Sequence, residues 1–124
     1  MWNDTWWNNI HRNIQVLCLI ISGMIEFVGS FQDKDFLYFV SEYCPFGDLG
    51  LVLLELYQCY KNGHCEEVEK LMKIYIYQIT SAILFLHREG VAHLDVKPKN
   101  IVVDNNYNLK LIDFATCCFF EEQK

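Results

Sequence analysis

The feature that most constrains the fold of this chain is a long amphipathic stripe in its second half. From Glu66 onward the apolar residues recur at the i, i+3, i+4, i+7 spacing of an α-helix, at Val68, Leu71, Met72, Tyr75, Ile79, Ala82, Ile83 and Leu86. Two acidic residues at its start and Arg88 near its end suit the helix dipole, and Gly90 can end the helix. We interpret the stripe as the core-facing side of a helix.

Two segments ahead of this helix predict a β-hairpin. Residues 36–43 (FLYFVSEY) are aromatic and β-branched and follow a polar turn at residues 32–35, which is typical of a strand. Residues 25–31 can form the partner strand. Residues 44–48 (CPFGD) then interrupt the pattern with Pro and Gly, and residues 49–60 predict a short helix.

A second hairpin is predicted after the long helix. Residues 93–100 form a polar loop, and residues 101–103 and 109–112 form two apolar strands around a turn at residues 104–106. The second strand leads directly into Asp113. The order of elements predicts one α+β unit, because no repeat, low-complexity tract or flexible linker divides the chain.

Charge and cysteine content exclude two classes of function. Ten Lys and Arg against sixteen Asp and Glu give a net charge of −6 without a basic stripe, so we expect no nucleic-acid binding. The six cysteines form no C-x-x-C pair, so neither a zinc site nor a disulfide framework is predicted. We expect reduced thiols in a cytoplasmic or, alternatively, nuclear protein, at Cys18, Cys44, Cys59, Cys65, Cys117 and Cys118.

Residues 14–25 (IQVLCLIISGMI) form a mostly apolar run near the N-terminus. The run is shorter than the ~20 residues that span a bilayer, and Glu26 closes it. The preceding residues carry Asp4, three Trp and little positive charge, and no A-x-A cleavage site follows. We expect a buried helix followed by a strand here, with a secreted or membrane-anchored protein as the alternative.

The polar loop and the strand after it carry the chemistry of the chain. Asp95, Lys97 and Asn100 lie within six residues, and the second hairpin returns Asp113 to the same edge. Asn and Asp oxygens suit Mg²⁺, which usually completes its coordination with waters and substrate phosphates. A nearby Lys can stabilise charge on a transferring phosphoryl group, and an Asp without a metal can orient a hydroxyl nucleophile. These residues together predict phosphoryl transfer.

The sequence here resembles the eukaryotic-type serine/threonine protein kinase family. HLDVKPKN and DFA match the family's H-R-D-x-K-x-x-N and D-F-G motifs. The resemblance implies ATP and Mg²⁺ as cofactors and a protein substrate or a partner kinase. It implies that Asp95 is the catalytic base, that Lys97 neutralises the γ-phosphate, and that Asn100 and Asp113 hold Mg²⁺. The position of Lys97, two residues after Asp95, resembles the serine/threonine branch of the family.

The upstream segment LYFVSEYCPFGDL resembles the family's hinge and the strand before it. The resemblance implies that Ser41 is the gatekeeper, that Glu42 to Cys44 offer backbone groups to adenine, that Asp48 contacts the ribose, and that Val102 lies beneath the adenine ring. It also implies that Phe27, His93 and Phe114 contribute to the hydrophobic spine between the lobes.

The fold class implied is α+β, a partial protein-kinase-like fold. Residues 1–24 form an N-terminal segment with a degenerate helix, residues 25–48 the N-lobe strands and hinge, and residues 49–124 the start of the C-lobe with the catalytic loop and DFA. Together they make a single partial kinase domain. With fewer elements to cover them, the helices are expected to expose an apolar patch.

Several family motifs are absent or altered in this sequence. No G-x-G-x-x-G loop, V-A-I-K lysine or A-P-E motif is present, and Arg12 lies where a helical Glu is expected. Leu94 replaces the Arg that pairs with a phosphorylated activation loop, and Ala115 replaces a Gly that can take positive φ. We expect weak nucleotide binding at best. Two alternatives stay open, a kinase-type core and an inactive pseudokinase fragment that serves as a protein-interaction module.

Overall fold

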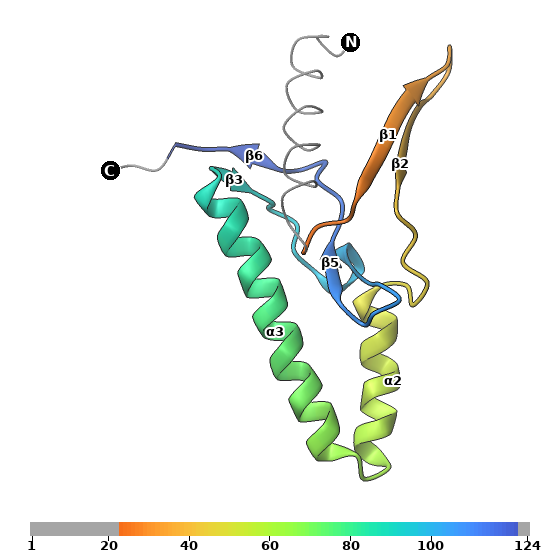
Figure 1. Cartoon of the computed structure of the whole chain (residues 1–124), viewed down its shortest axis with the longest axis vertical. Coiled ribbons are helices and arrows are strands. Elements are labelled where there is room, and N and C mark those ends of the chain that lie inside the picture. Colours follow the sequence, from red (N-terminus) through yellow and green to blue (C-terminus); the bar gives the residue numbers. More distant parts are fainter. Residues whose placement is uncertain (1–22, 122–124) are drawn as a thin grey trace.

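The structure of the chain is a computed structural model that describes residues 23–121 (Figure 1). It is an α+β structure in which two helices adjoin three separate two-stranded sheets. Its elements, in order, are β1 (Phe27–Gln32), β2 (Leu37–Ser41), α2 (Leu49–Lys61), α3 (Cys65–Arg88), β3 (Val91–Ala92), the 3₁₀ helix η1 (Pro98–Asn100), β4 (Ile101–Val103), β5 (Leu109–Leu111) and β6 (Cys118–Phe119).

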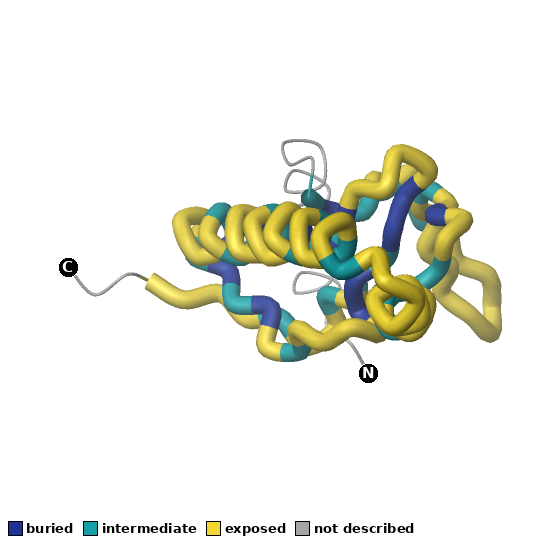
Figure 2. The backbone as a smooth tube through the Cα atoms, turned by 90° about the horizontal axis from the view of Figure 1, so that it is seen from below, coloured by how far each residue is buried: buried dark blue, intermediate teal, exposed yellow. Residues whose placement is uncertain are grey.

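The long helix predicted from the stripe is confirmed as α3. Every stripe residue from Val68 to Leu86 is buried or half-buried, whereas Ile74, Ile76 and Tyr77 on the remaining faces are exposed. Figure 2 shows the outer turns of α3 open to solvent along much of its length. Both helices expose apolar side chains, on α2 at Leu51, Leu54, Tyr57 and Tyr60 and on α3 at Ile74, Ile76, Tyr77 and Leu84.

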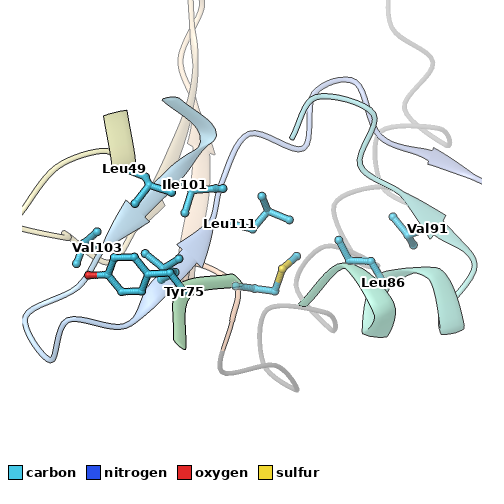
Figure 3. Close-up of a cluster of buried hydrophobic side chains, with 9 residues drawn as sticks. Leu49, Tyr75, Leu86, Val91, Ile101, Val103 and Leu111 are labelled. Atoms are coloured by element: carbon cyan, nitrogen blue, oxygen red, sulfur yellow. The ribbon is translucent and has the colours of Figure 1, made fainter. Parts of the chain in front are cut away.

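The core lies between α3 and the β4–β5 pair. Tyr75 and Leu86 of α3 belong to a buried cluster with Val103 of β4 and Leu111 of β5 (Figure 3). Met24 joins the same cluster and forms a parallel bridge with Leu111. The segment that enters β1 is therefore fixed to the strand that precedes Asp113.

The predicted second hairpin is confirmed as β4 and β5, which pair antiparallel from Ile101 opposite Leu111 to Val103 opposite Leu109. Its turn is held by the buried Asp104, whose carboxylate accepts hydrogen bonds from the N–H groups of Asn106 and Asn108. We call this pair the site hairpin. The hydrogen bonds of Asp104 fix this turn and so help to keep the two three-residue strands paired.

The predicted first hairpin is confirmed as β1 and β2, although its strands are shorter than predicted. The strands pair antiparallel from Phe27 opposite Ser41 to Gln32 opposite Leu37, with an irregularity between Phe27 and Gly29. All five residues of β2 are exposed. This ribbon projects away from α3 in Figure 1 and packs on the core mainly at its base, through Phe27.

One small sheet was not predicted. Strands β3 and β6 pair antiparallel, and the Phe120 N–H donates to the Gly90 carbonyl at 2.8 Å. Gly90 has φ +73°, and a Cβ added there would lie 2.7 Å from the Phe120 carbonyl oxygen. A glycine is required at this crossing for both conformational and steric reasons.

Some expectations concern residues that the structure does not describe. The helix predicted within residues 14–22, and the position of Arg12, lie outside the described residues. Among the helices within residues 23–121, none has the length and apolar character needed to cross a bilayer.

The Gly90 crossing gives a stability prediction. We expect Gly90→Ala to lower the free energy of unfolding by at least ~1–2 kcal/mol, because the new Cβ meets both a left-handed backbone and the Phe120 carbonyl. Gly29→Ala is the matched control, since a Cβ at Gly29 meets nothing within 4 Å. Urea unfolding of both variants measures the difference, and equal stability of the two would contradict this account of the crossing.

Candidate functional site

The loop between β3 and β4, residues 93–100, brings three of the predicted site residues together, and we call it the site loop. The Asn100 side chain is buried and donates from Nδ2 to the Asp95 carbonyl oxygen at 2.8 Å and to Asp95 Oδ2 at 2.9 Å. Lys97 Nζ lies 3.4 Å from Asp95 Oδ1. The two carboxylate oxygens of Asp95 therefore have different partners, one an amide and one an ammonium group.

His93 fixes the other end of the site loop. It is almost completely buried, accepts the Asp95 N–H at Nδ1 (3.1 Å) and bonds the Ile112 carbonyl from Nε2 (2.8 Å). Because a backbone N–H can only donate, Nδ1 is the unprotonated nitrogen and Nε2 carries the proton. His93 therefore ties Asp95 to the residue directly before Asp113.

Asp113 reaches the site loop through its neighbour Ile112. The Ile112 N–H donates to the Asn100 carbonyl at 2.9 Å, and its carbonyl accepts from His93. The Asp113 carboxylate accepts from the Ala115 N–H at 3.3 Å, and its residue is exposed. The backbone thus holds Asp113 at the edge of the site loop while its side chain faces outward.

Two non-glycine residues with left-handed backbone flank this arrangement, Leu94 at φ +68° and Asp113 at φ +61°. Such conformations cost of order 1 kcal/mol each and are retained where surrounding contacts fix them. The sequence raised the question whether the turn needs the positive φ that a Gly at position 115 would allow; in the structure the left-handed residue of this turn is Asp113. An alanine at position 115 therefore carries no left-handed strain.

The three residues expected in the hydrophobic spine, Phe27, His93 and Phe114, do not form one continuous set of ring contacts. The His93 and Phe114 rings meet edge to face with centroids 5.1 Å apart. Phe27 instead lies 6.4 Å from Phe39, and both Phe27 and Phe114 pack against the buried core cluster. The contact between His93 and Phe114 supports the ring whose nitrogens bond Asp95 and Ile112.

The segment from Glu42 to Asp48, which we call the hinge segment, runs beside β4. Asp48 forms an antiparallel bridge with Val102, and the Val103 N–H donates to the Gly47 carbonyl at 3.0 Å. The Asp48 carboxylate caps α2 by accepting the Leu51 N–H at 3.1 Å. Asp48 and Val102, both predicted to contact nucleotide, are thus neighbours.

The start of the hinge segment is anchored on both its backbone and its side chain. Glu42 donates its N–H to the Glu26 carbonyl at 2.9 Å and accepts the Glu26 N–H at Oε1 at 2.8 Å. The Ser41 hydroxyl lies 3.4 Å from the Glu42 carbonyl oxygen. The Cys44 carbonyl accepts the Gly47 N–H at 3.3 Å, and burial followed by the Glu42 carboxylate raises the pKa of the Cys44 thiol.

Two positioning side chains were missed by the sequence reasoning. Gln78 of α3 accepts the Leu109 N–H and donates to Asn108, which holds the site hairpin on the helix. Its position three residues after Tyr75 and four before Ala82, on the apolar stripe, was an available signal. Lys110 forms an ion pair with Glu42, and a pairing across 68 residues leaves no local signal.

The chemistry of the site is that of oxygen donors beside one ammonium group. Asn100 uses its amide nitrogen on Asp95, which leaves the amide oxygen as the end that suits a hard cation. Within residues 23–121 no group of three or more His, Cys, Asp or Glu side chains is arranged to hold a metal by itself. A cation here would need ligands from a bound molecule, as Mg²⁺ bound to phosphates does.

Comparison with known proteins gives consistent matches. The sequence model of the family described as protein kinase domain matches residues 3–124. The chain is 41% identical over 97 residues to serine/threonine-protein kinase Warts of Drosophila melanogaster, which covers 78% of this chain and 8% of that protein. It is 39% identical over 99 residues to serine/threonine-protein kinase LATS2 of Homo sapiens, with 78% of this chain and 8% of that protein covered.

A yeast relative extends the comparison. The chain is 38% identical over 102 residues to serine/threonine-protein kinase PKH1 of Saccharomyces cerevisiae, with 82% of this chain covered. The match covers 12% of PKH1. This chain therefore spans only a small part of the length of the curated relatives that it matches.

The bonds of Asn100 predict which residue holds the site loop in place. We expect Asn100→Ala to lower the free energy of unfolding by ~1–3 kcal/mol, because it leaves two half-buried oxygens of Asp95 without their donor. Lys97→Met should cost only ~0–1 kcal/mol, because the Lys97 side chain is 51% exposed. Denaturant titration of both variants provides the measurement, and a larger loss for Lys97→Met would reverse the assignment.

The thiols are expected to differ in reactivity. Burial raises the pKa of Cys44 and of Cys117, so at a given pH fewer of these thiols are ionised. At pH about 8 we expect iodoacetamide to modify the exposed Cys59 and Cys118 first, with Cys44 reacting only as the pH is raised further. Peptide mass spectrometry over a time course measures the order, and Cys44 reacting first would contradict it.

Proposed function

This chain belongs to the serine/threonine protein kinase family, and we propose that it forms the phosphoryl-transfer part of a kinase core acting on protein hydroxyl groups. The observation that carries the proposal is the placement of Asp95, which the buried Asn100 fixes on one side and Lys97 neutralises on the other. Family membership alone does not show activity, because function depends on the site.

Asp95 is the proposed catalytic base. Its Oδ2 accepts the Asn100 amide, which fixes the orientation of the carboxylate, while its side chain remains 33% exposed. A carboxylate that is oriented and still accessible can accept the proton of a substrate hydroxyl as that oxygen attacks phosphorus. The hydroxyl oxygen would form a bond to the γ-phosphorus of ATP as its proton moves to Asp95. The bond from that phosphorus to the bridging oxygen would break, and ADP would leave with the electron pair.

Lys97 is the proposed charge-stabilising residue. Its ammonium group is half exposed and 3.4 Å from Asp95 Oδ1, so it can shift toward a phosphoryl oxygen without leaving the site loop. A positive charge at this point favours the transition state, in which negative charge spreads over the transferring phosphoryl oxygens. Lys97 would thus alternate between Asp95 and the phosphoryl group.

Asn100 and Asp113 are the proposed Mg²⁺ ligands. The amide oxygen of Asn100 and the outward-facing carboxylate of Asp113 are hard donors of the kind Mg²⁺ prefers, and their backbones are joined through Ile112. When bound with ATP, the ion would neutralise phosphate charge. The backbone bond from Ile112 to Asn100 would keep the two donors at a constant spacing.

The hinge segment is the proposed adenine and ribose side. We propose that Ser41 borders the adenine pocket, that the backbone of Glu42 and Cys44 faces the base, and that Val102 packs beneath it. Asp48 would face the ribose, although its carboxylate also caps α2. The Glu42 N–H is already donated to Glu26, so the Glu42 contribution is limited to its carbonyl. We propose a cytoplasmic, or alternatively nuclear, location for this activity.

The exposed apolar surface favours a second candidate function, a pseudokinase-type interaction module. Exposed Leu and Tyr side chains on α2, and Ile and Tyr side chains on α3, would be buried by a partner such as another kinase. This candidate requires no phosphoryl transfer. The two functions are distinguished by whether phosphate transfer is observed and whether it depends on Asp95.

Phosphate transfer is tested with the purified chain, labelled ATP, Mg²⁺ and a generic protein substrate such as myelin basic protein. If the chain is a kinase core, we expect slow incorporation that falls at least ~100-fold in Asp95→Asn, because the amide cannot accept the hydroxyl proton. Asp33→Asn is the control, since Asp33 lies at the turn of the β1–β2 ribbon. Incorporation unaffected by Asp95→Asn, or none by the parent chain, would support the interaction module.

Nucleotide binding is tested separately by thermal unfolding. We expect Mg²⁺ and ATP together to stabilise the chain modestly, by about 1.4 kcal/mol when ATP is present at about ten times its Kd. Asp113→Ala should remove the Mg²⁺-dependent part of this stabilisation, because it deletes a proposed ligand. Stabilisation that persists without Mg²⁺ and in Asp113→Ala would contradict the assignment of the metal site.

A further inference from the structure

The ion pair of Lys110 and Glu42 joins two segments of the described chain that lie 68 residues apart. Lys110 lies in β5, three residues before Asp113, and Glu42 begins the hinge segment. The two side chains are only 16% and 23% exposed. The other ion pairs of residues 23–121 join Lys34 to Asp35 and Lys97 to Asp95, and each lies within one loop.

Three segments that are distant in sequence meet at this pair. Glu42 Oε1 accepts both the Lys110 ammonium and the Glu26 N–H, and the Glu42 N–H returns to the Glu26 carbonyl. Beside it, the Ile25 N–H donates to the Leu111 carbonyl at 3.2 Å. In Figure 1 the base of the β1–β2 ribbon accordingly lies beside β5. The entry to β1, the hinge segment and the site hairpin thus share one junction.

The β1–β2 ribbon forms a sheet of its own. All five residues of β2 are exposed, and β1 and β2 pair with each other in a separate two-stranded sheet. Lys110, in contrast, is held between the buried Leu109 and Leu111 and lies opposite Val102 in the site hairpin. The ammonium group of Lys110, carried by the site hairpin, therefore meets the Glu42 carboxylate at the base of the β1–β2 ribbon.

Because the two side chains are partly buried, we expect their electrostatic interaction to be stronger than that of a surface ion pair. Charges screened less by water interact more strongly, and removing one partner leaves the other charge uncompensated. Loss of the Lys110 charge would leave the Glu42 carboxylate without its cation, so the hinge segment would lose its side-chain link to the site hairpin. The two sides of the proposed nucleotide site would then move more independently.

We propose that Lys110 is a positioning residue that acts through Glu42 to hold the hinge segment at a fixed distance from the strand that carries Asp113. This inference rests on the proposed function for its consequence, which is that the pair sets the affinity for the adenosine part of a nucleotide. It requires no contact between Lys110 and the nucleotide. The phosphate side is left to Lys97, Asn100 and Asp113.

We call the Lys110–Glu42 pair and its hold on the hinge segment the clamp. The clamp is tested without any ligand, by amide hydrogen exchange of the full chain. In Lys110→Met we expect exchange across residues 24–43 to become about tenfold faster, which corresponds to ~1.4 kcal/mol, while amides of α3 keep their rates. Glu42→Gln keeps the acceptor for Glu26 but removes the charge, so it should have the same effect. Lys110→Arg should restore slow exchange, since it keeps the charge and the length.

Lys34→Met is the matched control, because it removes an exposed ion pair in the same ribbon. It should leave exchange at residues 24–27 and 40–43 unchanged. Unchanged exchange in both Lys110→Met and Glu42→Gln would overturn the proposed clamp. Uniformly faster exchange that includes α3 would also overturn it, since that pattern reports general destabilisation rather than a loosened ribbon.

The consequence for binding is tested by titrating the same variants with adenosine and with Mg²⁺ and ATP. We expect Lys110→Met to raise both Kd values by the same factor, about five- to tenfold, and Lys110→Arg to leave them near the parent values. A loss confined to ATP would overturn the positioning role, because it would indicate a phosphate contact. Absence of binding by the parent chain would overturn the proposed function, while hydrogen exchange would still decide whether the clamp exists.

Discussion

The contact between α3 and the site hairpin is the constraint on which the rest of the structure depends. Tyr75 and Leu86 bury their side chains with Val103 and Leu111, and Gln78 bonds the backbone of Leu109 directly. Strands of three residues are too short to be stable alone, so β4 and β5 require this helix. Once they are fixed, both ends of the site loop and the position of Asp113 are fixed as well.

Hydrogen bonds to the backbone hold the polar side chains of the site loop in place on this scaffold. His93 and Asn100 lie at its two ends, and each bonds both Asp95 and the backbone of Ile112. The same two residues therefore orient the proposed base and align the strand that leads to Asp113. Lys97, more exposed and held by a single ion pair, is the member of the site that is free to move.

Much of this fold follows from the sequence because its signals are local. The stripe of α3 predicted which side chains are buried, and the strands of the site hairpin were predicted to within one residue. The β3–β6 pair and the Lys110–Glu42 ion pair were not predicted, because they join segments that are distant in sequence and two-residue strands carry no pattern. The effect of Ala115 could not be predicted, because the motif identifies residue types but does not say that Asp113 is the residue of the turn with positive φ.

The pairing of β3 with β6 has a consequence for how the molecule is organised. It brings Gly90 and Phe120 into contact, so the two ends of the intervening segment lie side by side next to the end of α3. Asp95, Lys97, Asn100 and Asp113 all lie within this segment. Because β4 and β5 also depend on α3, this segment and the helix before it form one structural unit. The chemistry proposed for this chain would therefore be inherited only together with that helix.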